Sequence, residues 1–297
     1  MIRTRKGIIM AGGSGTRLDP MTRVVNKHLL PVFDKPMIYY PISTLMLAGI
    51  RDILVITSPE HEEPLRELLG DGRAWGITLS FALQDRPRGL ADAFRVGADF
   101  VGTDPVALIL GDNIFHGQGL SVLLQDVAAD PFGVTLFAVA VRDPERFGIV
   151  ELDDRGRPVS IEEKPQRPRS NLAITGLYFF DGNAVEYARA LHPSARGELE
   201  ITDLNRKYVE QGAAKVHVLH RGYTWLDTGT PSSLLQAATY VEIIQSRQSS
   251  GVAVPEEVAW RMDFIDDARL RELAARLPKG EYAAYLTDML ARERRSN

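Results

Sequence analysis

Short apolar runs alternate with amphipathic segments along the first third of the chain. Each run has the length of a buried strand, and the segments between the runs carry apolar residues at the spacing of one helix face. This alternation predicts an α/β fold with a doubly wound, Rossmann-like sheet whose crossovers are right-handed. The predicted strands are 7–10, 53–56, 78–82 and 106–110, and the predicted helices are 37–48, 62–69 and 90–100.

The pattern changes at Gly133, after which β-type runs follow one another with short connections. Such runs fit antiparallel strands added beside the parallel ones, so the sheet is predicted to be mixed. A loop and a helix from Ile201 to about Glu210 follow these strands. The predicted strands of this part are 134–141, 148–152, 158–163 and 173–180.

Beyond Pro231 the pattern is helical to the end of the chain, with breaks at Gly251 and at 278–280. We see no linker rich enough in turn residues to separate an independent domain. We therefore predict a core of residues 1–231, with halves at about 1–130 and 131–231, and a C-terminal helical extension of residues 232–297 that serves packing and oligomerisation. The predicted helices of the extension are 232–250, 255–262, 266–277 and 282–295.

A glycine-rich loop follows the first predicted strand and reads Gly12, Gly13, Ser14, Gly15, Thr16. Glycine accepts positive φ and has no Cβ, so backbone N–H groups in such a loop can surround an anion. Arg17 and Lys27 follow on the same stretch, and they supply cations suited to phosphate oxygens. We interpret residues 11–36 as a triphosphate-binding loop. A glycine turn without a ligand is the alternative, and the two cations make it less favoured.

Two better-known glycine motifs are absent from this loop. A P-loop requires a lysine directly after its last glycine, but Gly15 is followed by Thr16 and Arg17. A dinucleotide-binding fingerprint requires a third glycine that opens a helix, and Leu18 stands at that position. The loop is therefore neither of these.

Composition limits the classes of function. Hydrophobic residues make up 44% and charged residues 25%, which are values of a soluble globular protein. The net charge of −4 argues against a dedicated nucleic-acid binder. Cysteine is absent, which excludes a thiolate nucleophile, a thiolate metal site and a disulfide framework. No run has the length of a signal-peptide core or a membrane span, so we expect a cytoplasmic protein that binds no membrane.

Two aspartates stand at places where ligands are often bound. Asp112 follows the fourth predicted strand, and the carboxyl ends of strands in such sheets bind ligands. Asp227 lies beside Trp225 and a glycine turn. Taken alone, Asp112 is better explained by a turn or a helix cap than by a ligand site. Trp225 is about as well explained by a core position as by a surface that stacks on a sugar.

Together these motifs resemble those of the sugar-phosphate nucleotidylyltransferase family, and the resemblance covers the chain from about Lys6 to its end. The tail P-E-E-V-A-W-R at 255–261 resembles the short tetrameric, thymidylyl-transferring members. The motifs that carry the resemblance are A-G-G-S-G-T-R-L at 11–18, K-H-L-L-P at 27–31, D-K-P-M-I-Y-Y-P at 34–41, L-G-D-N at 110–113, E-E-K-P at 162–165, R-G-E-L-E-I-T-D at 196–203 and W-L-D-T-G-T at 225–230.

The resemblance implies a fold of the nucleotide-diphospho-sugar transferase type and a thymidylyl transfer from dTTP to glucose 1-phosphate. The phosphate of the sugar attacks the α-phosphorus in line and expels pyrophosphate, so no enzyme nucleophile is needed. The residues implied as catalytic are Arg17, Lys27, Asp112 and Asp227, with Mg²⁺ held by the two aspartates. By the same resemblance, residues of about 1–130 bind nucleotide and those of about 131–231 bind sugar.

The resemblance also assigns binding residues and partners. The nucleotide-binding set is Gly12, Gly13, Ser14, Gly15, Thr16, Arg17, Gln84 and Gly89, of which Gln84 and Gly89 read the thymine. The set for the sugar phosphate is Asn113, Gly148, Glu163, Lys164, Ile174, Arg196 and Trp225. Self-association to a homotetramer is expected, and relatives bind nucleotide at a second, regulatory site between subunits, whose residues the sequence does not assign.

Alternatives remain open within this resemblance. The family often has S-K-Q where Asn26, Lys27 and His28 stand here, which predicts tuning rather than loss of function because the lysine is kept. Arg86 and Arg88 flank the base-reading segment and leave UTP, or another sugar 1-phosphate, as an alternative substrate. A non-catalytic sensor of nucleotide sugars on the same fold is the alternative from another class of protein.

Overall fold

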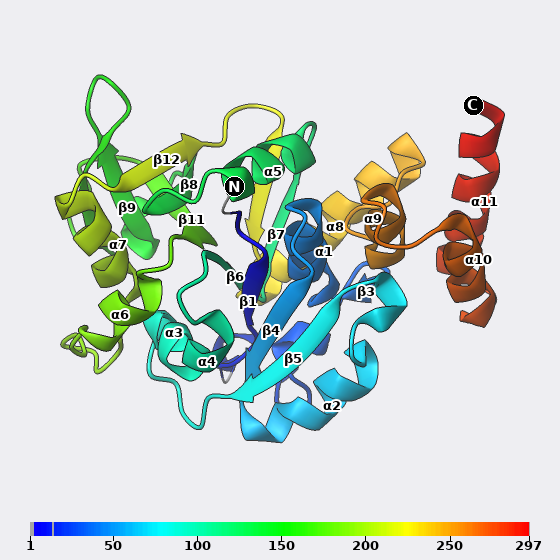
Figure 1. The fold of residues 1–297 in the computed structure, drawn as a ribbon, viewed down its shortest axis with the longest axis horizontal. Coiled ribbons are helices and arrows are strands. Elements are labelled where there is room, and N and C mark those ends of the chain that lie inside the picture. The colour runs from blue at the N-terminus through cyan, green and yellow to red at the C-terminus, as the bar shows by residue number, and fades with distance from the viewer. Residues whose placement is uncertain (1–2, 14, 297) are drawn as a thin grey trace.

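A mixed sheet forms the middle of the molecule and helices cover both of its faces (Figure 1). The computed structural model describes residues 3–13 and 15–296, with side chains described as far as residue 292. Within these residues nine strands run in the order β10-β9-β11-β6-β1-β4-β5, with β8 and β12 continuing from the other edge of β11. The strands are β1 Lys6–Met10, β4 Asp52–Thr57, β5 Thr78–Leu83, β6 Val106–Leu110, β8 Val134–Ala140, β9 Gly148–Leu152, β10 Pro158–Glu163, β11 Leu172–Phe180 and β12 Ala214–Val218.

The first half of the sheet is parallel, as the alternation of strands and helices predicts. β1 lies between β4 and β6, and Met10 is in register with Ile56 on one side and Leu110 on the other. The carboxyl ends of β1 and β6 therefore lie side by side. The order of the strands reverses at this pair, and such a point is where open α/β sheets bind ligands.

The second half is antiparallel around β11, as predicted. The first part of β11 pairs with β9, its last part pairs with β6, and β8 pairs along its other edge. β12 adds to β8 in the parallel sense. β12 was not predicted, because its sequence, Ala214 to Val218, alternates polar and apolar residues over only five positions.

Two small sheets and the helices complete the core. β7 Asn113–Gly117 pairs with β13 Tyr223–Asp227, and β2 Pro31–Val32 pairs with β3 Lys35–Pro36. The predicted helix 90–100 is broken into η4, α3 and α4, because the chain turns at Gly97. The other helices of the core are α1 Tyr39–Leu47, α2 Pro59–Leu69, α5 Leu120–Ala129, α6 Ala184–Arg189 and α7 Ile201–Glu210, and the broken segment is η4 Leu90–Asp92, α3 Ala93–Val96 and α4 Ala98–Val101.

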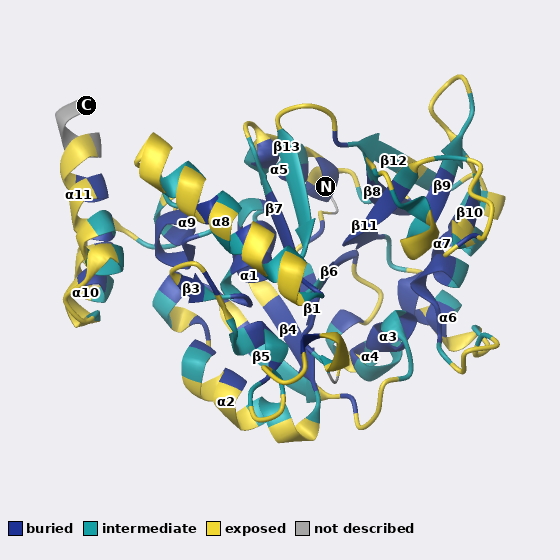
Figure 2. Ribbon diagram, turned by 180° about the vertical axis from the view of Figure 1, so that it is seen from behind, coloured by how far each residue is buried: buried dark blue, intermediate teal, exposed yellow. Residues whose placement is uncertain are grey.

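The hydrophobic core lies on both faces of the sheet. Neighbouring residues of a strand point to opposite faces, and the fully buried Ile8 and Ile9 of β1 accordingly belong to separate core clusters. Figure 2 shows buried strands between helices whose outer faces are exposed. The apolar runs of the parallel strands are thus explained by burial on both sides.

The C-terminal helices form the predicted extension. α9 packs against α1, while α10 and α11 form a small core of their own around Leu270 and Leu286. Figure 1 places α10 and α11 at one end of the molecule. The extension consists of α8 Pro231–Gln248, α9 Pro255–Arg261, α10 Asp267–Arg276 and α11 Glu281–Ser296. The division of the chain into 1–231 and 232–297 stays a prediction.

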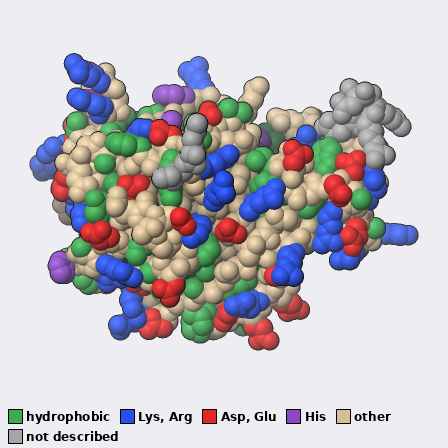
Figure 3. Space-filling view, viewed as in Figure 1, with side chains coloured by type: hydrophobic (Ala, Val, Ile, Leu, Met, Phe, Trp, Pro, Cys, Tyr) green, Lys and Arg blue, Asp and Glu red, His purple; other side chains and the backbone are tan. Residues whose placement is uncertain are grey.

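Two observations concern the surface. In the described part of the chain, no helix is long and apolar enough to cross a membrane. Positive and negative side chains are interspersed over the face of the molecule that Figure 3 displays.

Lys35 joins the core to the extension. Its ammonium group is almost fully buried, pairs with Asp34 and donates to Oε1 of Gln245 on α8 at 3.2 Å. Burial lowers the pKa of Lys35, and Asp34 opposes that shift. Gln245 also donates to Asp34, at 2.9 Å. One buried cation therefore ties the β2–β3 hairpin to α8.

We expect Lys35→Met to lower the free energy of unfolding by about 1–3 kcal/mol, because the partly buried Asp34 would lose its cation. Urea denaturation measures the change. The control is Lys215→Met, which breaks an ion pair to Asp130 whose side chains are 44% and 67% exposed and which should cost less than about 1 kcal/mol. Equal losses in the two variants would contradict this role for Lys35.

Candidate active site

A cavity of about 350 Å³ opens at the carboxyl ends of the central strands. Its walls come from the glycine loop, the segment after β5, the end of β6, the β9–β10 hairpin and α7 with the loop before it. Segments that are far apart in the sequence therefore meet here. The predicted site residues that line it are Gly12, Gly13, Lys27, Gln84, Gly89, Asp112, Gly148, Glu163, Lys164, Ile174 and Arg196.

The glycine loop needs its glycines for its backbone conformation. Gly13 and Gly15 have φ values of 102° and 59°, in the region that side chains with a Cβ rarely adopt. The hydroxyl of Thr22 donates to the carbonyl oxygen of Gly15 at 2.9 Å and closes the loop. Thr16 and Arg17 follow in a short 3₁₀ turn that the buried Leu18 anchors. Ser14 lies outside the described residues.

Lys27 and Asp112 form an ion pair at one end of the cavity. The Nζ atom of Lys27 lies 2.6 Å from Oδ2 of Asp112, and Nδ2 of Asn113 donates to Oδ1 at 3.0 Å. Burial alone would raise the pKa of Asp112, but Lys27 and the hydrogen bonds outweigh it and hold the pKa at about 2. Asp112 is therefore a carboxylate at neutral pH.

Asp227 stands next to Asp112 because two strand ends meet. In the β7–β13 pair Asp227 faces Asn113, and the hydroxyl of Thr228 donates to the backbone oxygen of Asp112 at 2.8 Å. Burial and the charge of Asp112 raise the pKa of Asp227, whereas Arg17 and Lys27 lower it. The two aspartates thus share one region, and two cations lie near them.

Gly229 makes room for Arg17. A Cβ on Gly229 would lie 2.6 Å from Nη2 of Arg17 and 3.0 Å from Oδ1 of Asp227. The backbone N–H of Gly229 donates to that same oxygen at 3.0 Å. The absence of a side chain at Gly229 therefore lets a guanidinium approach the carboxylate of Asp227.

His28 is a buried neutral group below the loop. Nδ1 and the backbone N–H of His28 both contact Oδ1 of Asn26 at 2.7 Å, and Nε2 has no partner among the described residues. Burial and then Lys27 lower the pKa of His28 from 6.5 to about 3. Gly111 packs against the ring, where a Cβ would lie 2.5 Å from it. His28 is therefore a packing residue rather than a general base.

The predicted base-reading residues Gln84 and Gly89 also line the cavity. Gln84 follows β5 and is 7% exposed. Gly89 has a φ of 98°, and a Cβ there would lie 2.4 Å from the carbonyl oxygen of Leu199. The backbone N–H of Leu199 in turn donates to the oxygen of Arg88 at 2.7 Å. This contact joins the base-reading segment to the loop before α7.

The charged residues of the predicted sugar-phosphate set, Glu163, Lys164 and Arg196, form one network. Nη2 of Arg196 donates to Glu200 at 2.9 Å and lies 3.5 Å from Glu163, and Nζ of Lys164 is 3.8 Å from Glu163. The hydroxyl of Thr202 donates to Glu163 at 2.6 Å. Lys164 has a φ of 46°, so the strand bends there and Glu163 and Lys164 line the same cavity. Burial would lower the pKa of Arg196, but Glu200 and Glu163 raise it.

Six predicted residues do not line the cavity in the described structure: Gly15, Thr16, Arg17, Asn113, Trp225 and Asp227. The Nε1 atom of Trp225 donates to Oδ1 of Asn113 at 2.6 Å, and the backbone N–H of Gly176 donates to the same oxygen at 3.0 Å. Trp225 also packs edge-to-face on Phe147, which does line the cavity. The predicted contact of Asn113 and Trp225 with a sugar stays a prediction.

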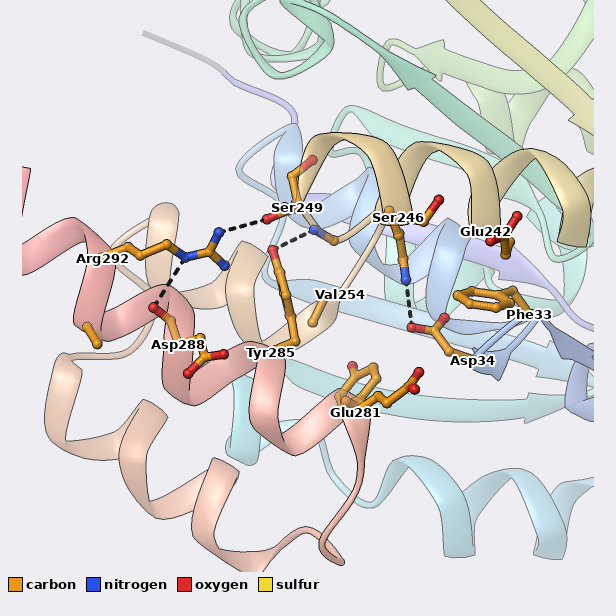
Figure 4. A pocket seen from close by; sticks show the side chains of 15 residues that line it. Phe33, Asp34, Glu242, Ser246, Ser249, Val254, Glu281, Tyr285, Asp288 and Arg292 are labelled. Atoms are coloured by element: carbon orange, nitrogen blue, oxygen red, sulfur yellow. Dashed lines mark hydrogen bonds between the residues drawn. The ribbon is translucent and has the colours of Figure 1, made fainter.

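A larger cavity, of about 690 Å³, lies between α8 and α11 (Figure 4). Asp34, Glu242, Glu281 and Asp288 line it, with Arg292 as its basic residue. In Figure 4 the side chain of Asp34 points toward the base of α8 while Tyr285 reaches the turn after that helix. This excess of negative charge disfavours a phosphate ligand, so the smaller cavity is the better candidate.

Comparison with known proteins identifies the family of this chain. A profile of the nucleotidyl transferase family matches residues 6–243. The chain belongs to the nucleotidyl transferase family. Among curated relatives, a glucose-1-phosphate thymidylyltransferase of Neisseria meningitidis is 57% identical over 96% of this chain and 99% of its own. Proteins of the same name from Xanthomonas campestris and Mycobacterium tuberculosis are 56% and 52% identical, each over 97% of this chain and at least 98% of their own.

Solved structures agree with the fold of this nucleotidyl transferase family member. The structure of a glucose-1-phosphate thymidylyltransferase candidate from Bacillus anthracis aligns with a TM-score of 0.73 at 41% identity, over 79% of this chain and 94% of that one. A UDP-glucose pyrophosphorylase aligns with a TM-score of 0.69 at 23% identity, over 82% and 99% of the two chains. The second likeness concerns the fold alone.

The two aspartates of this nucleotidyl transferase fit a magnesium ion that is also bound by substrate. Burial, and after it the charge of Asp112, raise the pKa of Asp227, and a divalent cation would relieve the repulsion between the two carboxylates. No cluster of three or more His, Cys, Asp or Glu that could hold a metal occurs within residues 3–13 and 15–296. Two carboxylates completed by phosphate oxygens are a common way of binding Mg²⁺, which prefers such hard ligands.

Some lining residues were not predicted from the sequence. Glu200 and Thr202 stand within the motif at 196–203, so the motif itself was the available signal. Tyr178 and Asn205 carried no signal, because they sit in an apolar strand and an amphipathic helix. Burial raises the pKa of Tyr178, so its hydroxyl remains protonated. The remaining unpredicted lining residues are Met10, Pro87, Leu90, Leu110, Arg146, Phe147, Glu198 and Ile201.

We expect Gly229→Ala to displace Arg17 and weaken the binding of a nucleoside triphosphate about tenfold, or about 1.4 kcal/mol. The melting temperature should change little, because the displaced atoms are the free end of an exposed side chain. Isothermal titration calorimetry measures the affinity, and Gly280→Ala, in the loop before α11, is the control. Unchanged affinity in Gly229→Ala would remove Arg17 from the triphosphate site.

Stability should fall with decreasing pH because of His28. The unfolded chain takes up a proton on His28 below about pH 6.5, and the folded chain does so only near pH 3. Between about pH 6.5 and pH 4.5 this difference removes about 2 kcal/mol of stability. His28→Gln should lose that part of the pH dependence in urea denaturation, whereas the exposed His192→Gln should keep it. The same slope in both variants would contradict a neutral buried His28.

Proposed function

We propose that this protein transfers the thymidylyl group of dTTP to glucose 1-phosphate and releases dTDP-glucose and pyrophosphate. The observation that carries the proposal is that Lys27, Asp112, Lys164 and Arg196 line one cavity at the reversal point of the sheet. Asp227 lies close enough to Asp112 for the charge of Asp112 to raise its pKa, in addition to the effect of burial. Cations at both ends suit two phosphorylated substrates. The names of the relatives, at 50–57% identity, supply the base and the sugar.

The reaction is a displacement at phosphorus. An oxygen of the sugar phosphate attacks the α-phosphorus of dTTP, and the bond from that phosphorus to the bridging oxygen breaks as pyrophosphate leaves. All reacting groups are anionic, so the protein contributes by positioning them and by stabilising the charge that develops. This needs no nucleophilic side chain and is compatible with a chain without cysteine.

Each cation has a role in this scheme. Arg17, with its planar fork of donors, holds the triphosphate and stabilises the leaving pyrophosphate. Lys27 would release Asp112 and contact the phosphates, since its ammonium can reorient on a flexible stem. Asp112 and Asp227 would hold Mg²⁺, which when bound neutralises charge on the α-phosphate.

Different residues would contact the base, the phosphates and the sugar of the two substrates. Gln84 and Gly89 would contact thymine, and the glycine loop, Gly12 to Thr16, would surround the phosphates. Lys164 and Arg196 would grip the phosphate of the sugar. The groups proposed for its hydroxyls are Gly148, Glu163 and the backbone at Ile174, with Asn113 and Trp225 near them.

The wider setting is also part of the proposal. We infer that the chain acts in the cytoplasm as a homotetramer that uses its helical extension for assembly, without nucleic-acid or membrane partners. Sedimentation velocity tests the assembly. The alternatives are a preference for UTP or another sugar 1-phosphate, and a non-catalytic sensor of nucleotide sugars. The presence of both aspartates, Arg17 and Lys27 argues against the sensor.

A direct assay tests the reaction. The protein is mixed with Mg²⁺, glucose 1-phosphate and each nucleoside triphosphate in turn, and pyrophosphate is measured. We expect the highest kcat/KM with dTTP. A higher value with UTP would replace the proposed donor, and no pyrophosphate with any triphosphate would eliminate the enzyme.

Within that assay, Asp227→Asn should reduce kcat by at least about a hundredfold while it changes the KM of both substrates much less. The reason is that its charge acts mainly on the transition state. Asp154→Asn, at the exposed turn between β9 and β10, is the control and should behave like the unaltered chain. An increase in KM as large as the loss of kcat would mean that Asp227 only positions substrate.

A further inference from the structure

Asp92 is a buried carboxylate whose burial the fold does not explain. It stands at the junction of η4 and α3 and is 1% exposed. No ion pair of Asp92 occurs among the described residues, and its side chain does not cap α3. Burying a carboxylate without a cation is costly. Because the burial of this carboxylate costs free energy, we expect Asp92 to have a role other than stabilising the fold.

The contact of Asp92 is with the predicted base-reading residue. The Nε2 atom of Gln84 donates to Oδ2 of Asp92 at 2.9 Å, and both side chains are buried. A carboxylate only accepts hydrogen bonds, whereas a carboxamide has one donating and one accepting end. Asp92 therefore fixes which end of the Gln84 amide points toward it, namely the NH₂ end.

The other end of the amide consequently faces the cavity. A Cβ on Gly12 would lie 3.6 Å from Oε1 of Gln84, and Gly12 and Gln84 both line the cavity. In the described part of the chain, no donor is recorded for this oxygen. The cavity therefore presents a fixed hydrogen-bond acceptor beside the glycine loop.

A fixed acceptor distinguishes between pyrimidine bases. Thymine and uracil carry an N–H at position 3, which an amide oxygen can accept, whereas cytosine has an unprotonated nitrogen there. Two acceptors facing each other in a buried site leave both unpaired and cost free energy. The orientation of one amide can therefore separate imide bases from cytosine.

We propose that Asp92 is a positioning residue that locks the Gln84 amide and so selects nucleotides with an imide base over cytosine nucleotides. The proposal rests on the proposed function, because it places the base at Gln84. What it adds is a residue that touches no substrate yet decides which base is accepted.

The test compares Asp92→Asn with the unaltered protein. Asparagine has nearly the same shape but can accept or donate, so the Gln84 amide is free to turn over. Equilibrium binding of dTTP, dUTP and dCTP is measured by calorimetry without glucose 1-phosphate, so that no turnover occurs. We expect the ratio of dTTP affinity to dCTP affinity to fall at least tenfold in Asp92→Asn, with the ratio of dTTP to dUTP unchanged.

A purely structural role would give another result. Loss of packing would weaken all three nucleotides by the same factor and leave both ratios as they are, which would overturn the proposal. Asp99→Asn, at an exposed position of α4, is the matched control. If Asp92→Asn does not fold, Asp92→Ser supplies the same comparison, since a hydroxyl also fails to fix the amide.

Failure of this inference and failure of the proposed function can be told apart. If the unaltered protein binds dTTP no more tightly than dCTP, the role of Asp92 is wrong whether or not pyrophosphate is formed. If it prefers dTTP and loses that preference in Asp92→Asn, the role of Asp92 holds even where the sugar acceptor is another hexose phosphate.

Discussion

The site depends on the pairing of β13 with β7, which holds two carboxylates together at the end of the parallel strands. Asp112 lies just after β6, whereas Asp227 lies more than a hundred residues later in the chain. The neighbour of Asp227, Thr228, holds it in place because its hydroxyl donates a hydrogen bond to the backbone oxygen of Asp112. Their repulsion is balanced by Lys27 and Arg17. A pair of like charges held this way is unfavourable alone, and in the proposed reaction a bound cation would offset that repulsion.

The electrostatic design is local. The chain carries a net charge of −4, and charges of both signs are interspersed on the face shown in Figure 3. Cations nevertheless converge in the cavity from the loop after β1, the bend at Lys164 and the loop that carries Arg196. The larger cavity beside α11 has the opposite balance of charge, so size alone would select the cavity that is less suited to phosphate.

Much of the fold could be predicted from hydrophobic patterning, because strands buried on both faces give continuous apolar runs such as 106–110. β12 and β13 could not be predicted in this way. β12 is short and half exposed. β13 carries threonine, tryptophan and aspartate in a pattern that also suits a loop. Lys27 was identified from its place on the glycine-rich stretch, whereas the metal-binding role of Asp112 and Asp227 came from motif resemblance. Their proximity results from pairing between distant segments, which the local spacing of apolar residues does not predict.

The same limit applies to residues that act through others. In the sequence Asp92 is one residue of the predicted helix 90–100, and only its contact with Gln84 points to a further role. In the sequence Gly229 looks like an ordinary turn glycine, and Gly89 is assigned only to the base. Each instead lets a neighbour approach closely, the guanidinium of Arg17 in one case and the backbone of Leu199 in the other.

The most direct test of the shared site is a crystal structure of the protein with dTDP-glucose and Mn²⁺, recorded at a wavelength at which manganese scatters anomalously. The account predicts an anomalous peak bound by both Asp112 and Asp227, with the diphosphate against the glycine loop and the sugar beside Glu163. Manganese bound by neither aspartate, or the nucleotide sugar seated between α8 and α11, would contradict it.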